Sequence, residues 1–255
     1  MWRVRGFSIQ GYAHLTEGTP CQDAYRQATV GTSALLAVAD GAGSRPRSAE
    51  GAAILVSVTI DVLTAMVKAP GDPADAHQLK ARLGQAYQWI RDQFIKQVTA
   101  LAGQGQAGEF AATLIAAVVT DGLLGIIQVG DGFAVSRTRN QHGTTRLHLL
   151  TQPTVVGQYS NETVFITSPG ASPVISCFVD DSITGVLLST DGLMPAALAY
   201  ERGQPETVNE DFAGRVLGHL DADGRDPRLI VRTMLSDGVV GLTGDDLTLL
   251  AAVRA

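Results

Sequence analysis

Two stretches of the chain carry apolar residues at the three- and four-residue spacing of an α-helix. The first covers residues 48–69 and begins with Ser48, a candidate N-cap. The second, residues 76–101, has its apolar side chains on one stripe with charged ones opposite. That stripe consists of Leu79, Leu83, Tyr87, Ile90, Phe94 and Val98. The pattern predicts two consecutive helices, with linker-like segments at 69–75 (APGDPAD) and 103–108 (GQGQAG).

Most of the remaining chain consists of short apolar segments separated by turn residues, which is typical of β-strands. The dipeptide Asp121-Gly122 interrupts the most apolar stretch and predicts a hairpin. The tail is expected to be helical from Pro227 to about Leu235, and residues 245–254 end the chain as a strand. The other strands are expected within residues 6–14, 34–40, 110–119, 123–130, 133–139, 145–152, 163–168, 174–180 and 184–190. Runs of closely linked strands with a pair of helices inserted predict an α+β fold with antiparallel sheets.

Composition and charge narrow the possible functions. The chain has 255 residues, of which 45% are hydrophobic and 17% charged, an ordinary globular balance. A net charge of −6 argues against a general nucleic-acid or membrane-surface binder. No signal peptide is apparent, and no uninterrupted apolar run reaches the roughly 18 residues that span a bilayer. The only cysteines, Cys21 and Cys177, are too few for a disulfide framework, so we expect a soluble cytoplasmic protein.

Several acidic residues stand at or just beyond the end of an apolar segment. Asp40, Asp131 and Asp191 are each followed by glycine, and the pair Asp245-Asp246 precedes the last apolar segment. Any single Asp-Gly has an ordinary explanation as a turn. Strand ends from distant parts of the chain can, however, converge at one edge of a sandwich. Carboxylates gathered there repel one another unless cations lie among them, and ligation by oxygen alone suits Mg²⁺ or Mn²⁺.

These motifs occur in an order that resembles the metal-dependent Ser/Thr protein phosphatases of the protein phosphatase 2C class, in its bacterial branch. The order is CQDA with Asp23, then VADGAGS, AATLIAAVV, VGDGFAVSR, STDGL and GDDLTLL, and the resemblance extends from about residue 7 to 253. It implies a four-layer α-β-β-α sandwich of two antiparallel sheets flanked by helices, with a metal site at one edge. It also implies one catalytic domain over residues 1–255.

The resemblance further implies roles for individual residues. Asp40 would bridge two Mg²⁺ or Mn²⁺ ions, and the Gly41 carbonyl would bind one of them. Asp191 and Asp245 would complete the coordination of the other ion, and Asp23 would hold metal-bound water. A hydroxide that bridges the two ions would attack phosphorus, so no phosphoenzyme is required. The substrate would be a phosphorylated protein, a target of a Ser/Thr kinase.

Two further positions have alternative interpretations. Asp131 matches a position associated with a third, loosely held metal, and we favour this role because its Asp-Gly repeats the pattern of Asp40 and Asp191; the alternative is a hairpin turn. Asp246 falls where the family commonly has Asn, so we place Asp245 ahead of it as the ligand. Residues 157–168 (GQYSNETVFITS) occupy the region where other members carry loops that contact the substrate.

Two departures from the family pattern concern the substrate phosphate. The Arg that the family usually has five residues before Asp23 is replaced by Gly18, and the His that often follows the first Asp-Gly is replaced by Ala42. Arg45, Arg47 or His14 could compensate, and we favour Arg45 because it precedes a helix N-terminus, a favourable anion site. Taken alone, His14 is better explained as a structural histidine that satisfies backbone groups.

A second function from a different class stays open at this point. The chain could be a catalytically weak or inactive member that keeps the fold as a phosphoprotein-binding or regulatory module. The missing Arg favours this alternative. The retained acids oppose it, because carboxylates clustered without metal destabilise a fold. A dinucleotide site is disfavoured because GQGQAG follows a helix and precedes a strand, the reverse of the required order.

Overall fold

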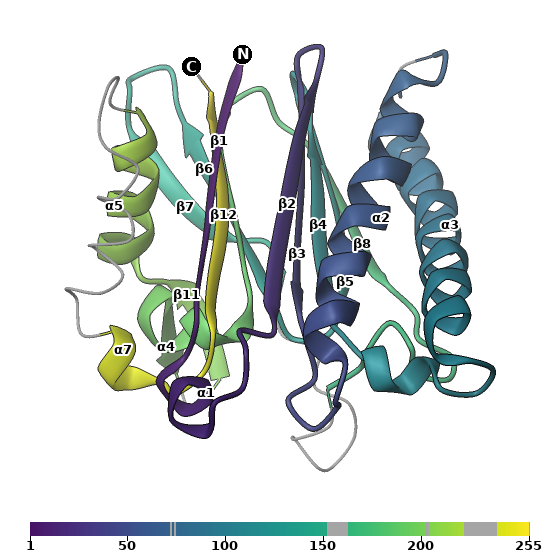
Figure 1. Cartoon of the computed structure of the whole chain (residues 1–255). Helices are drawn as coiled ribbons and strands as arrows, with labels where there is room; N and C mark the ends of the chain where they lie inside the picture. Colours follow the sequence, from purple (N-terminus) through teal and green to yellow (C-terminus); the bar gives the residue numbers. More distant parts are fainter. Residues whose placement is uncertain (72, 74, 152–162, 202–203, 222–238, 255) are drawn as a thin grey trace.

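The computed structural model describes the whole chain except residues 72, 74, 152–162, 202–203, 222–238 and 255. Two five-stranded antiparallel sheets lie face to face (Figure 1). The β1 sheet has the order β1 (Trp2–Ile9), β12 (Leu247–Arg254), β9 (Ile183–Ser189), β6 (Phe133–Arg139) and β7 (Thr145–Leu149). The β2 sheet has the order β2 (Asp23–Val30), β3 (Ser33–Asp40), β4 (Leu114–Val119), β5 (Leu123–Val129) and β8 (Val174–Val179).

Helices cover the outer face of each sheet, which completes four layers (Figure 1). The β2 sheet is covered by α2 (Ser48–Lys68) and α3 (Ala76–Ala102). The β1 sheet is covered by α4 (Met194–Ala197), α5 (Glu210–Asp221) and α7 (Val239–Leu242). The short elements are α1 (Tyr12–Glu17), η1 (Ala107–Phe110), η2 (Asp191–Leu193) and the hairpin of β10 (Leu198–Glu201) with β11 (Gln204–Val208). The α-β-β-α sandwich expected from the sequence is confirmed.

Strand β3 explains why some segments are continuously apolar rather than alternating. Its residues 33–39 are all buried, because both faces of the strand are covered. Leu35 and Ala37 pack with α2 and α3, whereas Leu36 and Val38 pack between the two sheets. Burial on both faces makes this strand a rigid support for the residue that ends it, Asp40.

The two long helices lie where their periodicity predicts them. Asp75 caps α3, since its side chain accepts a hydrogen bond from the Gln78 N–H at 2.8 Å. Ser48 is not an N-cap but the first residue of α2, and its Oγ donates to the Arg45 carbonyl instead. By length and composition α2 is apolar enough to cross a membrane, although its sequence has no uninterrupted apolar run of that length. It packs against the β2 sheet and α3, as a core helix does.

Several other expectations need correction. Residues 12–14 belong to α1 rather than to a strand, because the chain turns at Gly11 beside Gly244, where Ala13 N–H donates to the Gly244 carbonyl. Residues 163–168 form no strand, and β4 begins only at Leu114. The sequence pattern did not identify α5, β10 or β11 as elements. The helix expected at 227–235 falls outside the described residues. The Asp121-Gly122 hairpin is confirmed, with Thr120 N–H donating to the Leu123 carbonyl.

Candidate active site

The acidic residues singled out in the sequence all lie at the same edge of the sandwich. Asp40 ends β3 and pairs with Asp23, the first residue of β2. Asp191 comes two residues after the end of β9, and Asp245 comes two residues before the start of β12. These strands belong to different sheets, so the acids meet where the two sheets face each other.

Asp131 is not part of a hairpin. It lies between β5 and β6, and these strands belong to opposite sheets, so the chain crosses the sandwich at this residue. The hairpin interpretation of its Asp-Gly is therefore wrong. The crossing places Asp131 between the ends of β3 and β9.

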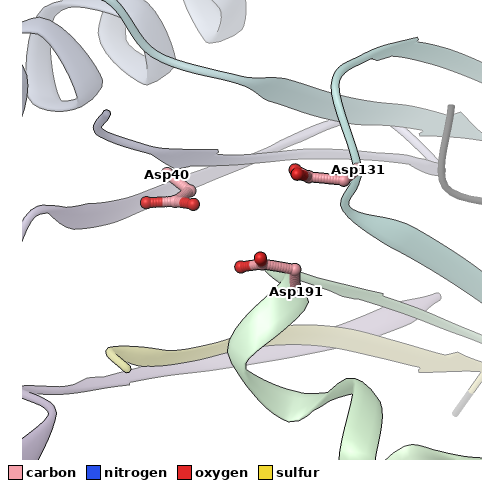
Figure 2. A group of neighbouring side chains, drawn as sticks. All are labelled: Asp40, Asp131 and Asp191. Carbon is pink, nitrogen blue, oxygen red and sulfur yellow. The ribbon is translucent and has the colours of Figure 1, made fainter. Parts of the chain in front are cut away.

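Asp40, Asp131 and Asp191 form an aspartate cluster. One carboxylate oxygen from each lies within 4.8 Å of the other two. Figure 2 shows the three side chains around a common space, each coming from a different segment. They open into an acidic cavity of about 210 Å³. The cavity is lined by His14, Gln22, Asp40, Gly41, Ala42, Gly43, Asp131, Thr163, Phe165, Asp191 and Asp245.

Threonines hold the acids in place. Asp40 exchanges two hydrogen bonds with Thr113, donating its N–H to Oγ1 at 3.1 Å and accepting from the Thr113 N–H at 2.8 Å. Thr163 Oγ1 donates to Asp131 Oδ2 at 2.6 Å, but the buried Asp131 Oδ1 has no hydrogen-bond partner among the described residues. Thr190 Oγ1 donates to Asp23 Oδ2 at 2.8 Å. Asp23 does not line the cavity and lies behind Asp40.

Glycine at position 41 is required by packing. A Cβ there would lie 2.7 Å from the Ser48 backbone and 2.9 Å from the Gln22 carbonyl oxygen, closer than real contacts allow. Gly41 also donates its N–H to that carbonyl at 3.1 Å and lines the acidic cavity. The close approach fixes the loop that follows Asp40.

The electrostatics of the site are unfavourable without a cation. Burial, helped by the neighbouring carboxylates, raises the pKa of Asp23 and of Asp191 from 3.8 to about 7. Burial and the charges of Asp23, Asp191, Asp245 and Asp131 raise the pKa of Asp40 well above its ordinary value. Uncompensated carboxylates together with an orphaned buried oxygen fit a divalent cation. Carboxylate and carbonyl donors, without Cys or His in the cluster, are those that Mg²⁺ or Mn²⁺ takes.

Asp245 and Asp246 differ sharply in their surroundings. Asp245 is exposed and lines the acidic cavity. Asp246 is 2% exposed and accepts backbone hydrogen bonds from Gly11 at Oδ1 and from Gln22 at Oδ2, at 2.7 and 2.6 Å. Asp246 does not line the cavity.

The structure places the three candidates for phosphate binding in different surroundings. His14 lines the acidic cavity, on α1, and its Nδ1 lies 3.0 Å from Asp246 Oδ1. Arg45 is exposed and does not line the cavity. Arg47 is engaged elsewhere: its guanidinium lies 4.1 Å from the centre of the Phe110 ring and pairs with Glu50 at 2.8 Å. Within the described part of the chain, no Arg or Lys lines this cavity.

Sequence reasoning missed Gln22, Thr163 and Phe165, which also line the cavity. Gln22 precedes Asp23 in the CQDA motif, but nothing in that motif marks its side chain. Thr163 and Phe165 belong to the segment expected to contact the substrate. Residues 157–162 of that segment lie outside the described residues.

Comparison with known proteins gives a family match over most of the chain and a relative that spans all of it. The sequence matches the family described as protein phosphatase 2C over residues 10–236. It is 29% identical over 263 residues to serine/threonine-protein phosphatase 3 of Escherichia coli (strain K12), covering 100% of this chain and 99% of that protein.

Solved structures of low sequence identity share the fold. A bacterial serine phosphatase superposes with a TM-score of 0.67 at 17% identity, covering 100% of this chain and 98% of that one. The serine/threonine phosphatase Stp1 of Staphylococcus aureus superposes with a TM-score of 0.65 at 18% identity, covering 100% of this chain and 96% of that one. The two sheets flanked by helices are thus an architecture known from bacterial phosphatases.

Proposed function

This chain belongs to the protein phosphatase 2C family and is a protein serine/threonine phosphatase, and we propose that it hydrolyses phosphoproteins with divalent cations held at the aspartate cluster. The observation that carries the proposal is the convergence of Asp40, Asp131 and Asp191, within 4.8 Å, from strand ends of both sheets. The raised pKa values of Asp40 and Asp191 support it, because they indicate carboxylates that lack a positive partner.

The proposal assigns two core ions, Mg²⁺ or Mn²⁺, to this site. Asp40 would contact both ions, and the Gly41 carbonyl would contact one of them. Asp191 and Asp245 would complete the coordination of the other ion. Asp23, the neighbour of Asp40 across the β2–β3 pair, would hold metal-bound water. The cations would activate a water molecule for in-line attack on phosphorus and offset the charge that develops on the phosphoryl oxygens.

Asp131 would hold a third, weaker cation together with Asp191. Its Oδ2 is already engaged by Thr163 Oγ1, which leaves Oδ1 as the atom that would face a cation. One carboxylate oxygen offers less to a metal than two, and a weak site follows from this arrangement.

On the substrate side, we propose Arg45 and His14 as the groups that approach the phosphate. Arg45 is exposed on the loop between Gly41 and α2, and His14 forms part of the cavity wall. The substrate would be a protein phosphorylated by a Ser/Thr kinase. The protein would act in the cytoplasm, and residues 1–255 would form one catalytic domain. A net charge of −6 argues against nucleic-acid or membrane-surface partners.

A phosphatase assay with controlled metal tests the proposal. The purified protein should release phosphate from a phosphoserine peptide and from p-nitrophenyl phosphate with Mn²⁺ or Mg²⁺. EDTA should stop both reactions, and excess Mn²⁺ should restore them. Full activity in EDTA would refute the metal-dependent mechanism.

A further inference from the structure

A histidine and a buried aspartate form a pair in the wall of the acidic cavity. His14 Nδ1 lies 3.0 Å from Asp246 Oδ1, and Asp246 is 2% exposed. The two groups form an ion pair when the His14 ring is protonated. Asp246 is itself fixed by the backbone N–H groups of Gly11 and Gln22, which leaves it little freedom to move.

The pair differs from the aspartate cluster in its hydrogen bonds. Both oxygens of Asp246 accept backbone N–H groups, whereas Asp131 Oδ1 has no hydrogen-bond partner among the described residues. His14 is half-buried and lines the cavity, and Nδ1 is the nitrogen that faces Asp246. Nε2 is the ring nitrogen that Asp246 does not engage.

We infer that His14 is a catalytic proton donor to the leaving oxygen of the substrate, with Asp246 as the positioning residue that pairs with its ring. The inference rests on the proposed phosphatase function. When the P–O bond to the serine oxygen breaks, the bonding pair stays on that oxygen, and the proton of His14 Nε2 moves onto it to form the serine hydroxyl. The attacking water supplies the new P–O bond, and the proton that it loses passes to solvent, from which His14 is protonated again.

Charges around His14 favour its protonated form. The contact with Asp246 is the largest influence and, with Asp245 beside it and Glu17 on α1, raises the pKa of His14 above 6.5, whereas burial opposes this. A protonated ring suits a group that must release a proton late in the reaction.

The wall of the cavity offers few alternative donors. Among the described residues that line it, the other side chains with transferable protons are Thr163 and the aspartates. Thr163 Oγ1 already donates to Asp131, and the aspartates belong to the proposed cation site. An alkoxide leaving group needs a proton, so the position of His14 has a chemical use that a purely structural histidine would not have.

The test compares two leaving groups in the metal-loaded enzyme. A phosphoserine peptide releases a strongly basic alkoxide, whereas p-nitrophenyl phosphate releases a weakly basic phenolate that leaves without a proton. His14→Gln should lower kcat for the peptide about a hundredfold or more and kcat for the aryl ester by less than about tenfold. The fall of kcat at high pH on the peptide should also disappear. His142→Gln, on the exposed β6–β7 turn, is the matched control and should leave both substrates unaffected.

The outcomes separate the possibilities. Equal losses of kcat on both substrates, or a change confined to KM, would overturn the proton-donor role and leave the phosphatase function standing. A wild-type protein that hydrolyses neither substrate with Mn²⁺ would overturn both. Asp246→Asn provides a second readout in the metal-free protein: NMR titration should show the His14 ring with a lower pKa than in the wild type. An unchanged His14 pKa in a variant that still unfolds cooperatively would overturn the role of Asp246.

Discussion

Replacing Asp191 by Asn should remove catalysis and yet stabilise the metal-free protein. The carboxylate lies with Asp40 and Asp131 in the aspartate cluster, where burial and the charges of Asp131 and Asp245 raise its pKa from 3.8 to about 7. In the unfolded chain the same group ionises near its ordinary value. Ionisation therefore opposes folding whenever no cation is bound.

The size of the effect follows from the pKa. Each pKa unit corresponds to about 1.4 kcal/mol, so the rise from 3.8 to about 7 makes ionisation cost about 4 kcal/mol in the folded, metal-free state. As pH rises past 3.8, the unfolded chain releases its proton first, while the folded protein keeps it until about pH 7. The free energy of unfolding thus falls between about pH 4 and pH 7, and the cost is complete above pH 7.

Asn is similar in shape and can keep one of the backbone hydrogen bonds that the carboxylate accepts. We expect Asp191→Asn to raise the free energy of unfolding by about 1–4 kcal/mol at pH 8 in EDTA, since some of the repulsion is already relieved by relaxation. The gain should vanish near pH 4. With saturating Mn²⁺ the wild type should instead be the more stable protein. Mn²⁺ binds only the folded state, and it stabilises the wild type more than a variant that has lost a ligand.

Urea unfolding at pH 4 and pH 8, in EDTA and in Mn²⁺, measures all four conditions. Asp92→Asn, on the exposed side of α3, is the matched control and should change little in any of them. If Asp191→Asn were less stable than the wild type in EDTA at pH 8, the acids would have to be compensated by the protein itself. The electrostatic argument for a cation site would then fail.

Four further substitutions test individual roles. Asp40→Ala should abolish turnover and Mn²⁺ binding by calorimetry while unfolding stays cooperative, and persisting turnover would exclude Asp40 as a ligand. Asp131→Asn should lower turnover in a way that higher Mn²⁺ partly relieves, whereas superimposable Mn²⁺ titrations would leave Asp131 with no metal role. Arg45→Ala should raise KM for aryl phosphates, and no change in kcat/KM would exclude it as an anchor. Arg47→Ala should instead cost about 0.5–1 kcal/mol of stability, seen in urea unfolding, through its lost contacts with Phe110 and Glu50.

The sequence predicted the convergence of the acids because that feature has a local cause. An apolar run followed by Asp-Gly marks a buried strand that delivers a carboxylate at its end, as β3 does with Asp40. Which strands pair is set by contacts between distant segments. The hairpin interpretation of Asp131 failed for this reason, since nothing near residue 131 indicates that β5 and β6 belong to opposite sheets.

Two local failures have a similar origin. Helix α1 buries no residue, so it leaves no apolar periodicity to detect, and tertiary contacts hold it in place. Residues 163–168 (TVFITS) contain the β-branched and aromatic residues typical of a strand, but the described chain closes a turn there, with Ser168 Oγ accepting from the Phe165 N–H. Ile166 makes one backbone bond to Ala112 and no ladder. Residue preference alone could not reveal that this segment lacks a strand partner.

The adjacent acids Asp245 and Asp246 show how position, rather than residue type, decides the use of a carboxylate. Asp245 is exposed at the cavity, where its charge is available to a cation. Asp246, one residue later, is buried, and its charge is satisfied by Gly11 and Gln22. Through these two bonds it ties α1, which carries His14, to the start of β2. The placement of the cavity wall therefore depends on a carboxylate that faces away from the proposed metals, and a change at Asp246 should alter the chemistry at His14 before it alters cation binding.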